Sequence, residues 1–181
     1  TDPAERDLTP WYWISPGWPI TKKPDHDRFS VYFNTDNGSG KFRGIYTEGN
    51  VAVESLFSEW FSPLSDLSEG TINANATGGT DHESFDDVGL PGFQFVQDPL
   101  DYRPRLHHTH VDSFDHVLPD DMRQAAVVMA TFAYEAAMAE NRVSRKPMPT
   151  APSELEQQQE QEKAKKRQRD KERKALSELP K

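Results

Sequence analysis

The fold is decided by residues 92–99, GFQFVQDP, in which an apolar and aromatic run ends abruptly at an Asp-Pro pair. Phe and Val are typical of strands, and proline stops the run because it cannot continue a ladder of backbone hydrogen bonds. We therefore expect a strand over Gly92–Gln97. Two further strands are expected at 29–34 and 71–76, each followed by polar, turn-forming residues.

Helical periodicity separates these strands. Apolar side chains recur every three or four positions over residues 50–61, and a shorter helix is expected at 83–88. The last helix opens at Pro119, followed by two aspartates that suit a first turn. This helix is expected to bury Met122, Ala125, Ala126, Met129, Phe132, Ala133 and Ala136. The alternation predicts an α/β domain, a three-layer sandwich with helices on both faces of a mostly parallel sheet.

The composition predicts three regions. Residues 1–28 form a Pro- and Trp-rich lead-in without regular structure, whose aromatic side chains are expected to cover the core or, alternatively, to contact a substrate or a dimer partner. Residues 29–149 form the main domain. Residues 150–181 hold nine basic and seven acidic side chains but few apolar ones, so a solvated helical or disordered tail is expected, with a partner-binding coiled coil as the alternative.

The charge balance and the residue counts exclude several classes of protein. The 181 residues carry 21 Lys and Arg against 30 Asp and Glu, a net charge of -9, and a mean hydropathy of -0.85. A surplus of acid argues against nucleic acid as a partner, and no apolar run is long enough to span a membrane. Because there is no cysteine, a metal would have to be held by His, Asp and Glu.

Three polar clusters follow predicted strands, where open α/β sheets place their ligands. They are Asn34-Thr35-Asp36-Asn37-Gly38, Gly79-Thr80-Asp81-His82 and His107-His108-Thr109-His110-Val111-Asp112-Ser113. The third cluster holds three histidines and an aspartate, which zinc accepts as ligands in the absence of thiolates. Residue types alone leave simpler interpretations open: a titrating surface loop for the third cluster, turn chemistry for Asp36, and a helix N-cap for Asp81.

In this order and spacing, the three clusters resemble the second half of the zinc exopeptidases of metallopeptidase family 28, which are dizinc aminopeptidases and carboxypeptidases. The resemblance covers residues 29–149, and its matching stretches are 32–40, 78–85, 89–92 and 107–113. The double histidine before Thr-x-x-Asp-Ser, followed by an Ala-rich helix, is most similar to a carboxypeptidase branch of the family.

The resemblance implies a role for each matched residue. Asp36 would be a carboxylate ligand of one zinc ion, and His108 an imidazole ligand of the other. The remaining polar residues would orient the ligands or contact the substrate: Asp81 and Asp112 as orienting carboxylates, and His82, His107 and His110 as weaker candidates for substrate contacts. The implied reaction is hydrolysis of a peptide bond at a chain end or in a dipeptide, with a glutamate as the general base.

The chain also departs from the family pattern. The family requires an upstream His, a bridging Asp and a Glu-Glu pair, whose first member is the general base. This chain contains no Glu-Glu dipeptide, and its only earlier histidine, His26, stands directly before the first matched strand. Two of five metal ligands are therefore present, and no catalytic base is. The main hypothesis is a segment of a longer exopeptidase that is inactive alone; the alternative is a non-catalytic pseudoenzyme or interaction module.

Other expectations concern the context of the chain. Because it starts at Thr1 rather than Met and shows no leader, we expect a processed or truncated N-terminus. The resemblance implies peptide or dipeptide substrates and a secreted or periplasmic location. It leaves homodimer formation and the choice between amino- and carboxypeptidase polarity open.

Overall fold

The computed structural model describes residues 20–147, 163, 165–167 and 169. The chain divides into two units, residues 1–149 and 150–181, which we describe separately. The described residues of the second unit are helical and exposed. The aromatic side chains expected to cover the core, at 11–13 and 18, lie outside the described residues. The proposed division at 29–149 and 150–181 stays a prediction.

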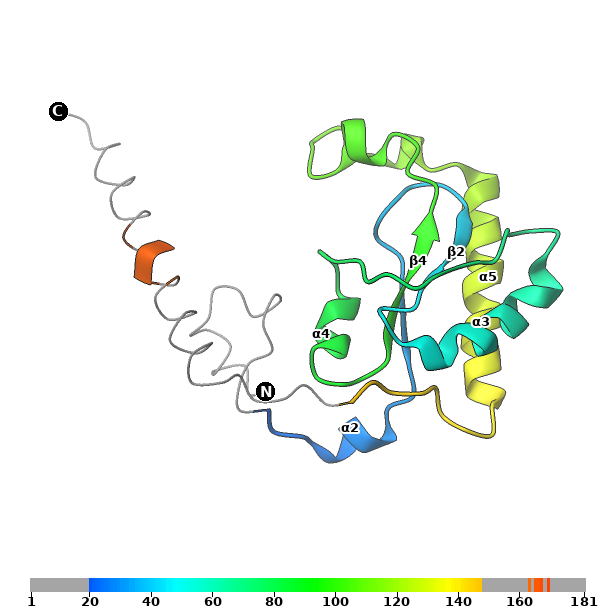
Figure 1. The fold of residues 1–181 in the computed structure, drawn as a ribbon. Helices are drawn as coiled ribbons and strands as arrows, with labels where there is room; N and C mark the ends of the chain where they lie inside the picture. The colour runs from blue at the N-terminus through cyan, green and yellow to red at the C-terminus, as the bar shows by residue number, and fades with distance from the viewer. Residues whose placement is uncertain (1–19, 148–162, 164, 168, 170–181) are drawn as a thin grey trace. The chain divides into compact units, whose positions relative to one another are not determined.

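The first unit alternates strands and helices, which confirms the predicted α/β class (Figure 1). Its strands are β1 (Tyr32–Asn34), β2 (Phe42–Tyr46), β3 (Thr71–Asn73) and β4 (Gly92–Gln97). Its helices are α2 (Pro24–Arg28), α3 (Glu54–Phe61), α4 (His82–Asp86) and α5 (Pro119–Met138). None of the helices among the described residues combines the length and apolarity that crossing a membrane requires.

The four strands form one sheet in the order β1-β4-β2-β3. The outer pairs, β1–β4 and β2–β3, are parallel, whereas the central pair β2–β4 is antiparallel. The sheet is therefore mixed, where the sequence predicted a mostly parallel one. The three-layer sandwich stays a prediction.

Strand β2 is absent from the sequence prediction because Arg43 and Gly44 interrupt its apolar pattern. The glycine is required by the neighbouring strand. A Cβ atom on Gly44 would lie 1.9 Å from the carbonyl oxygen of Thr71 in β3, so any side chain there would push the two strands apart. The register also shifts between Phe42 and Gly44, which is the mark of a β-bulge. Both features are set by the partner strands rather than by the local sequence.

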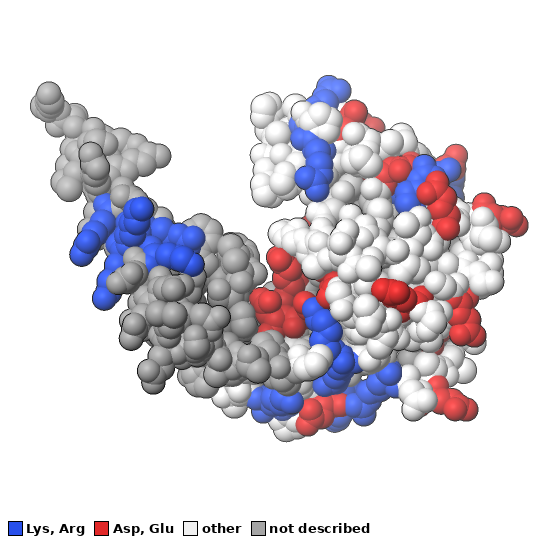
Figure 2. All heavy atoms as spheres, in the orientation of Figure 1, with Lys and Arg blue, Asp and Glu red and all other residues white. Residues whose placement is uncertain are grey.

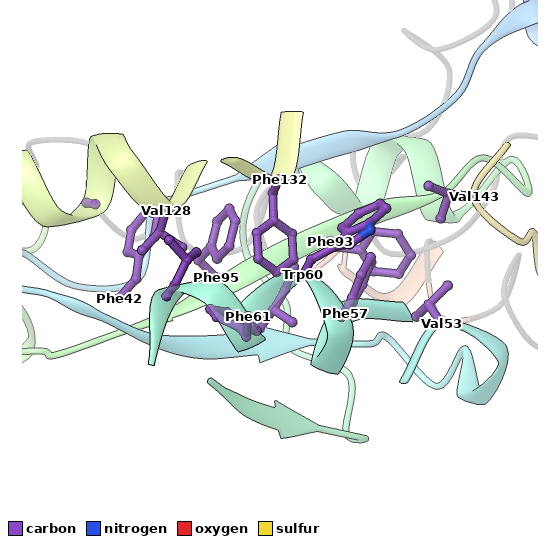
Figure 3. Close-up of a cluster of buried hydrophobic side chains, with 13 residues drawn as sticks. Phe42, Val53, Phe57, Trp60, Phe61, Phe93, Phe95, Val128, Phe132 and Val143 are labelled. Carbon is purple, nitrogen blue, oxygen red and sulfur yellow. The ribbon is translucent and has the colours of Figure 1, made fainter. Parts of the chain in front are cut away.

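An aromatic core fills one face of the sheet, beneath α3 and α5 (Figure 3). The ring of Phe132 in α5 contacts Phe57, Phe61 and Phe95 at centroid distances of 5.5, 4.6 and 5.3 Å. Phe33 of β1 lies 5.6 Å from Phe132 at an interplanar angle of 88°. Truncating a buried Phe to Ala in such a cluster costs about 3–5 kcal/mol, so these rings dominate the stability of the unit.

Helix α5 begins at Pro119 as predicted, but the face that it presents to the core agrees with the prediction only in part. Its buried residues are Gln124, Ala125, Val128 and Phe132, whereas Met122 is 55% exposed and Ala126 and Ala133 are also exposed. The prediction is confirmed for Ala125 and Phe132, and Met129 and Ala136 are partly buried against the core. It is wrong for Met122, Ala126 and Ala133, and it missed Val128 and Gln124. Gln124 is buried because its side-chain amide bonds the backbone of Phe42, at the β2 bulge, and the carbonyl of Leu67.

Helix α4 packs on the opposite face of the sheet, on the other side of β4 from α3 and α5 (Figure 1). The ring of Phe85 stacks on Tyr32 of β1 at 4.3 Å. Gly92, at the start of β4, allows this close approach, because a Cβ atom there would lie 2.5 Å from the carbonyl oxygen of His82. The helix is thereby held against the ends of β1 and β4.

The prediction that residues 1–28 hold no regular element is wrong within the described part of that range. Residues Pro24–Arg28 form the short helix α2. Proline at the first helical position is compatible with a helix, since its missing N–H would have no intrahelical partner there. Tertiary contacts hold the turn: the Nε2 atom of His26 lies 2.9 Å from the Val88 carbonyl, and the Arg145 guanidinium donates to the carbonyl oxygens of His26 and Phe29.

Candidate functional site

Two of the three polar clusters meet at one edge of the sheet. Asp36 follows the carboxyl end of β1, and the histidine cluster follows β4 through a π-helical turn, Tyr102–Leu106. Because β1 and β4 are adjacent and parallel, their carboxyl ends lie at the same edge (Figure 1). The hydroxyl of Tyr102 donates a hydrogen bond to the Asp36 carbonyl oxygen at 2.9 Å. This bond ties the first cluster to the loop that carries the third.

The histidine pair continues from the same tyrosine. The His107 ring lies 5.0 Å from the Tyr102 ring and stacks on His108 at 3.8 Å. His108 is exposed and has a φ of 59°, in the left-handed region that is uncommon for residues other than glycine. The hydroxyl of Thr109 donates to the carbonyl oxygen of Leu106 at 2.9 Å and so closes the turn behind the pair.

The second cluster is anchored to β1 by its threonine. The side-chain amide of Asn34 donates to Thr80 Oγ1 at 2.5 Å and to Gln94 Oε1 at 2.7 Å. Asp81 is exposed at the N-cap position of α4, but its side chain makes no capping hydrogen bond. Burial raises the pKa of the Tyr32 hydroxyl, and the negative charges of Asp81 and Asp36 raise it further. Both carboxylates therefore act on the same ring.

His82 is placed differently from the other candidates. Its ring is fully buried, with Nε2 lying 3.3 Å from a carboxylate oxygen of Glu48 and 3.1 Å from the Thr77 carbonyl. Burial alone lowers the pKa of His82, but the hydrogen bond and charge of Glu48 outweigh it, so the pKa is raised. Glu48 is itself only 3% exposed. A ring in this position is not accessible to a substrate, and it joins α4 to the end of β2.

The remaining two candidates, His110 and Asp112, are exposed. The pKa of the Tyr102 hydroxyl is raised first by burial and then by the charge of Asp36, while Arg103 opposes this and Asp112 adds to it. Asp112 therefore belongs to the electrostatic surroundings of Tyr102.

The residue types at this edge fit zinc, but the donors are too few. Asp36 supplies a carboxylate and His108 an imidazole, and both are exposed. Among the described residues, no group of three or more His, Asp or Glu side chains is gathered closely enough to hold a metal ion. A structural zinc ion takes four protein ligands and a catalytic one takes three. The described donors are therefore too few to hold a zinc ion by themselves.

The residue that joins the clusters, Tyr102, is missing from the sequence-based candidates. Its signal in the sequence is weak: an aromatic residue in an otherwise polar and Pro-containing stretch, five positions before the first histidine of the pair. Only the parallel pairing of β1 with β4 shows that its hydroxyl reaches the Asp36 loop.

The chain matches the model of peptidase family M28 over residues 17–133, and it belongs to that family. Among curated proteins it is similar to carboxypeptidase Q of Rattus norvegicus, with 28% identity, and of Mus musculus, with 26% identity. Each comparison extends over 123 residues, which is 68% of this chain and 26% of the relative. The chain therefore spans about a quarter of the length of these relatives. No solved structure matches it.

The family predicted from the three polar clusters is thereby confirmed. The two relatives also agree with the carboxypeptidase branch that the double histidine indicated.

Proposed function

We propose that this chain is the C-terminal part of a zinc-dependent exopeptidase that hydrolyses peptide bonds at a chain end or in dipeptides. The observation that supports this most directly is the hydrogen bond from Tyr102 to Asp36, two residues 66 positions apart, because it joins the first family motif to the turn that leads into the third. The family membership and the similarity to carboxypeptidase Q support the same reaction class.

Asp36 and His108 would supply two of the five metal ligands of the complete site. Zinc held there would provide a Lewis acid for the scissile carbonyl and would lower the pKa of a water molecule. Asp81 and Asp112 would orient the ligands, and loss of such supporting groups usually weakens metal affinity about 10- to 100-fold. The substrate would lie over the exposed loops, with His107 beside it.

Hydrogen bonds within this chain would hold the carboxylates of the proposed site in position. The bonds from Asn34 to Thr80 and from Tyr102 to the Asp36 carbonyl keep two exposed carboxylates, Asp36 and Asp81, close to β1. The general base, the bridging aspartate and the other ligands would come from residues outside this chain. We also propose export from the cytoplasm, in keeping with the family resemblance.

The test uses the complete protein that contains these residues. Asp36→Ala and His108→Ala should each abolish dipeptide hydrolysis and lower the zinc content measured by atomic absorption. His110→Ala is the matched control in the same loop and should retain most of its zinc. The 181-residue chain alone should not hydrolyse dipeptides above the uncatalysed rate, since losing a positioned base costs about 10²- to 10⁴-fold.

Two results would contradict the proposal. If His110→Ala emptied the site and His108→Ala left zinc and activity intact, the ligand assignment would be wrong by two residues. If the isolated chain showed chelator-sensitive hydrolysis, a base would have to exist among its own carboxylates.

A further inference from the structure

Two arginines on the π-helical turn differ from the other arginines of the described chain. Residues 20–147 contain seven arginines, and five of them bond a carboxylate or a backbone carbonyl: Arg28, Arg43, Arg123, Arg142 and Arg145. For Arg103 and Arg105, no hydrogen bond or ion pair of the guanidinium is found within residues 20–147, and both side chains are exposed.

An unpaired guanidinium is unusual on this acidic unit. Residues 1–149 carry 12 basic against 23 acidic side chains. On the face shown in Figure 2, the Lys and Arg side chains of the first unit lie in small separate groups, several of them beside acidic ones. Arginine stays charged at any ordinary pH, and its planar fork of N–H donors matches a carboxylate.

The two arginines have different surroundings. Arg103 follows Tyr102, whose hydroxyl bonds the Asp36 loop and whose ring contacts His107. Arg105 instead contributes to the lowered pKa of Asp115, after the larger effect of the Ser113 hydrogen bond. Arg103 is therefore the arginine that belongs to the candidate site.

The backbone around Arg103 is also irregular. The turn is closed by bonds from the Leu106 N–H to the Asp101 carbonyl, at 3.1 Å, and from the His107 N–H to the Tyr102 carbonyl, at 2.8 Å. Non-glycine residues with positive φ flank it, Leu100 at 42° and His108 at 59°. Both π-helical turns and left-handed residues of this kind are concentrated at functional sites.

We propose that Arg103 binds a carboxylate of the peptide substrate at the edge formed by Asp36, Tyr102 and His107. This inference rests on the proposed function, because it assumes that these loops bind a peptide. The carboxylate has two sources, the C-terminus of the substrate or an acidic side chain. The first source would give the site carboxypeptidase polarity.

The experiment titrates the ¹⁵N-labelled 181-residue chain with three probes that separate the two sources. They are acetyl-Gly-Ala with a free C-terminus, the same peptide as its C-terminal amide, and acetyl-Gly-Glu amide, which has only a side-chain carboxylate. The Nε–H signals of both arginines are followed by NMR. We expect at least one carboxylate probe to shift the Arg103 signal with an affinity about 5-fold or more above that of the neutral amide. The Arg105 signal should not respond.

Arg103→Ala should abolish this preference, and Arg103→Lys should retain part of it, since the charge remains but the bidentate fork is lost. Arg105→Ala is the matched control and should bind like the parent. Equal affinity for all three probes, or an unchanged preference in Arg103→Ala, would overturn the proposal. The proposed function is tested by a different experiment. It would fail if Asp36→Ala and His108→Ala in the complete protein kept their zinc and their hydrolytic activity.

Discussion

Substituting Gln124 in α5 tests the packing of the helix that covers the core. Its side-chain amide accepts a hydrogen bond from the Phe42 N–H at 2.9 Å and donates to the carbonyl oxygens of Phe42 and Leu67 at 2.9 and 3.0 Å. Gln124→Ala removes all three bonds. The Phe42 carbonyl keeps a second donor, the hydroxyl of Ser68. The Phe42 N–H and the Leu67 carbonyl lose these partners, and the N–H lies in the buried bulge.

The cost follows mainly from the Phe42 N–H. A buried donor left without a partner costs about 1–3 kcal/mol, whereas the carbonyl of Leu67, a residue that is 46% exposed, can be hydrated, so Gln124→Ala should lower the free energy of unfolding by about 1–3 kcal/mol. Gln124→Met keeps most of the volume but no amide, and it should recover little. Met122→Ala is the matched control on the same helix. Because Met122 is 55% exposed, its truncation should change stability by no more than about 0.5 kcal/mol.

The assay is urea unfolding followed by tryptophan fluorescence and circular dichroism, with Trp60 as a buried reporter. If Met122→Ala proved more destabilising than Gln124→Ala, Met122 rather than Gln124 would face the core, and the packing of α5 would differ from that described for Gln124. A Gln124→Met variant as stable as the parent would show that the three hydrogen bonds contribute nothing.

Two further predictions concern the tail and the pH dependence of stability. Deleting residues 150–181, which hold few apolar side chains, should change the free energy of unfolding by less than about 0.5 kcal/mol. Limited proteolysis should cut within these residues first. A deletion that unfolds the first unit would refute the predicted boundary between residues 149 and 150. Burial, with the charges of Asp86 and Glu83, raises the pKa of Asp87 to about 6. The Asp87 carboxyl group therefore binds its proton more tightly in the folded state than in the unfolded state. The free energy of unfolding should fall as the pH rises from about 4 to 6. Asp87→Asn should therefore match the parent near pH 4 and exceed it by of the order of 1 kcal/mol above pH 6.5 in urea melts; a gain confined to acidic pH would contradict this.

The elements that the sequence predicts best are those with a long periodic pattern. The helix after residue 50, the strand at Gly92–Gln97 and the helix at Pro119 all appear where the pattern and its end signals place them. The predicted strand at 29–34 is shorter, and residues 24–28 are helical, because contacts from Arg145 and Val88 stabilise a turn that has no strong local signal.

The candidate site was only partly predictable. The positions of the polar clusters after strands follow from the sequence, and so does the chemistry of their side chains. Which clusters meet does not follow, because it depends on strand pairing. His82 illustrates the difference: its position next to Asp81 indicates a site residue, yet the end of β2 brings Glu48 to its ring and encloses it in the interior.

The sequence by itself determined the α/β class, the peptidase family and the order of the three polar clusters, because periodicity and motif spacing are properties of the chain alone. The tertiary structure decided the antiparallel place of β2, the buried face of α5 and the meeting of Tyr102 with Asp36. Each of these depends on a partner supplied by a distant segment: the Thr71 carbonyl for Gly44, the Phe42 backbone for Gln124, and the end of β1 for Tyr102. The position of a single polar or small residue in the fold depends on such a distant partner. The position of a run of apolar residues can be predicted from its own periodic pattern.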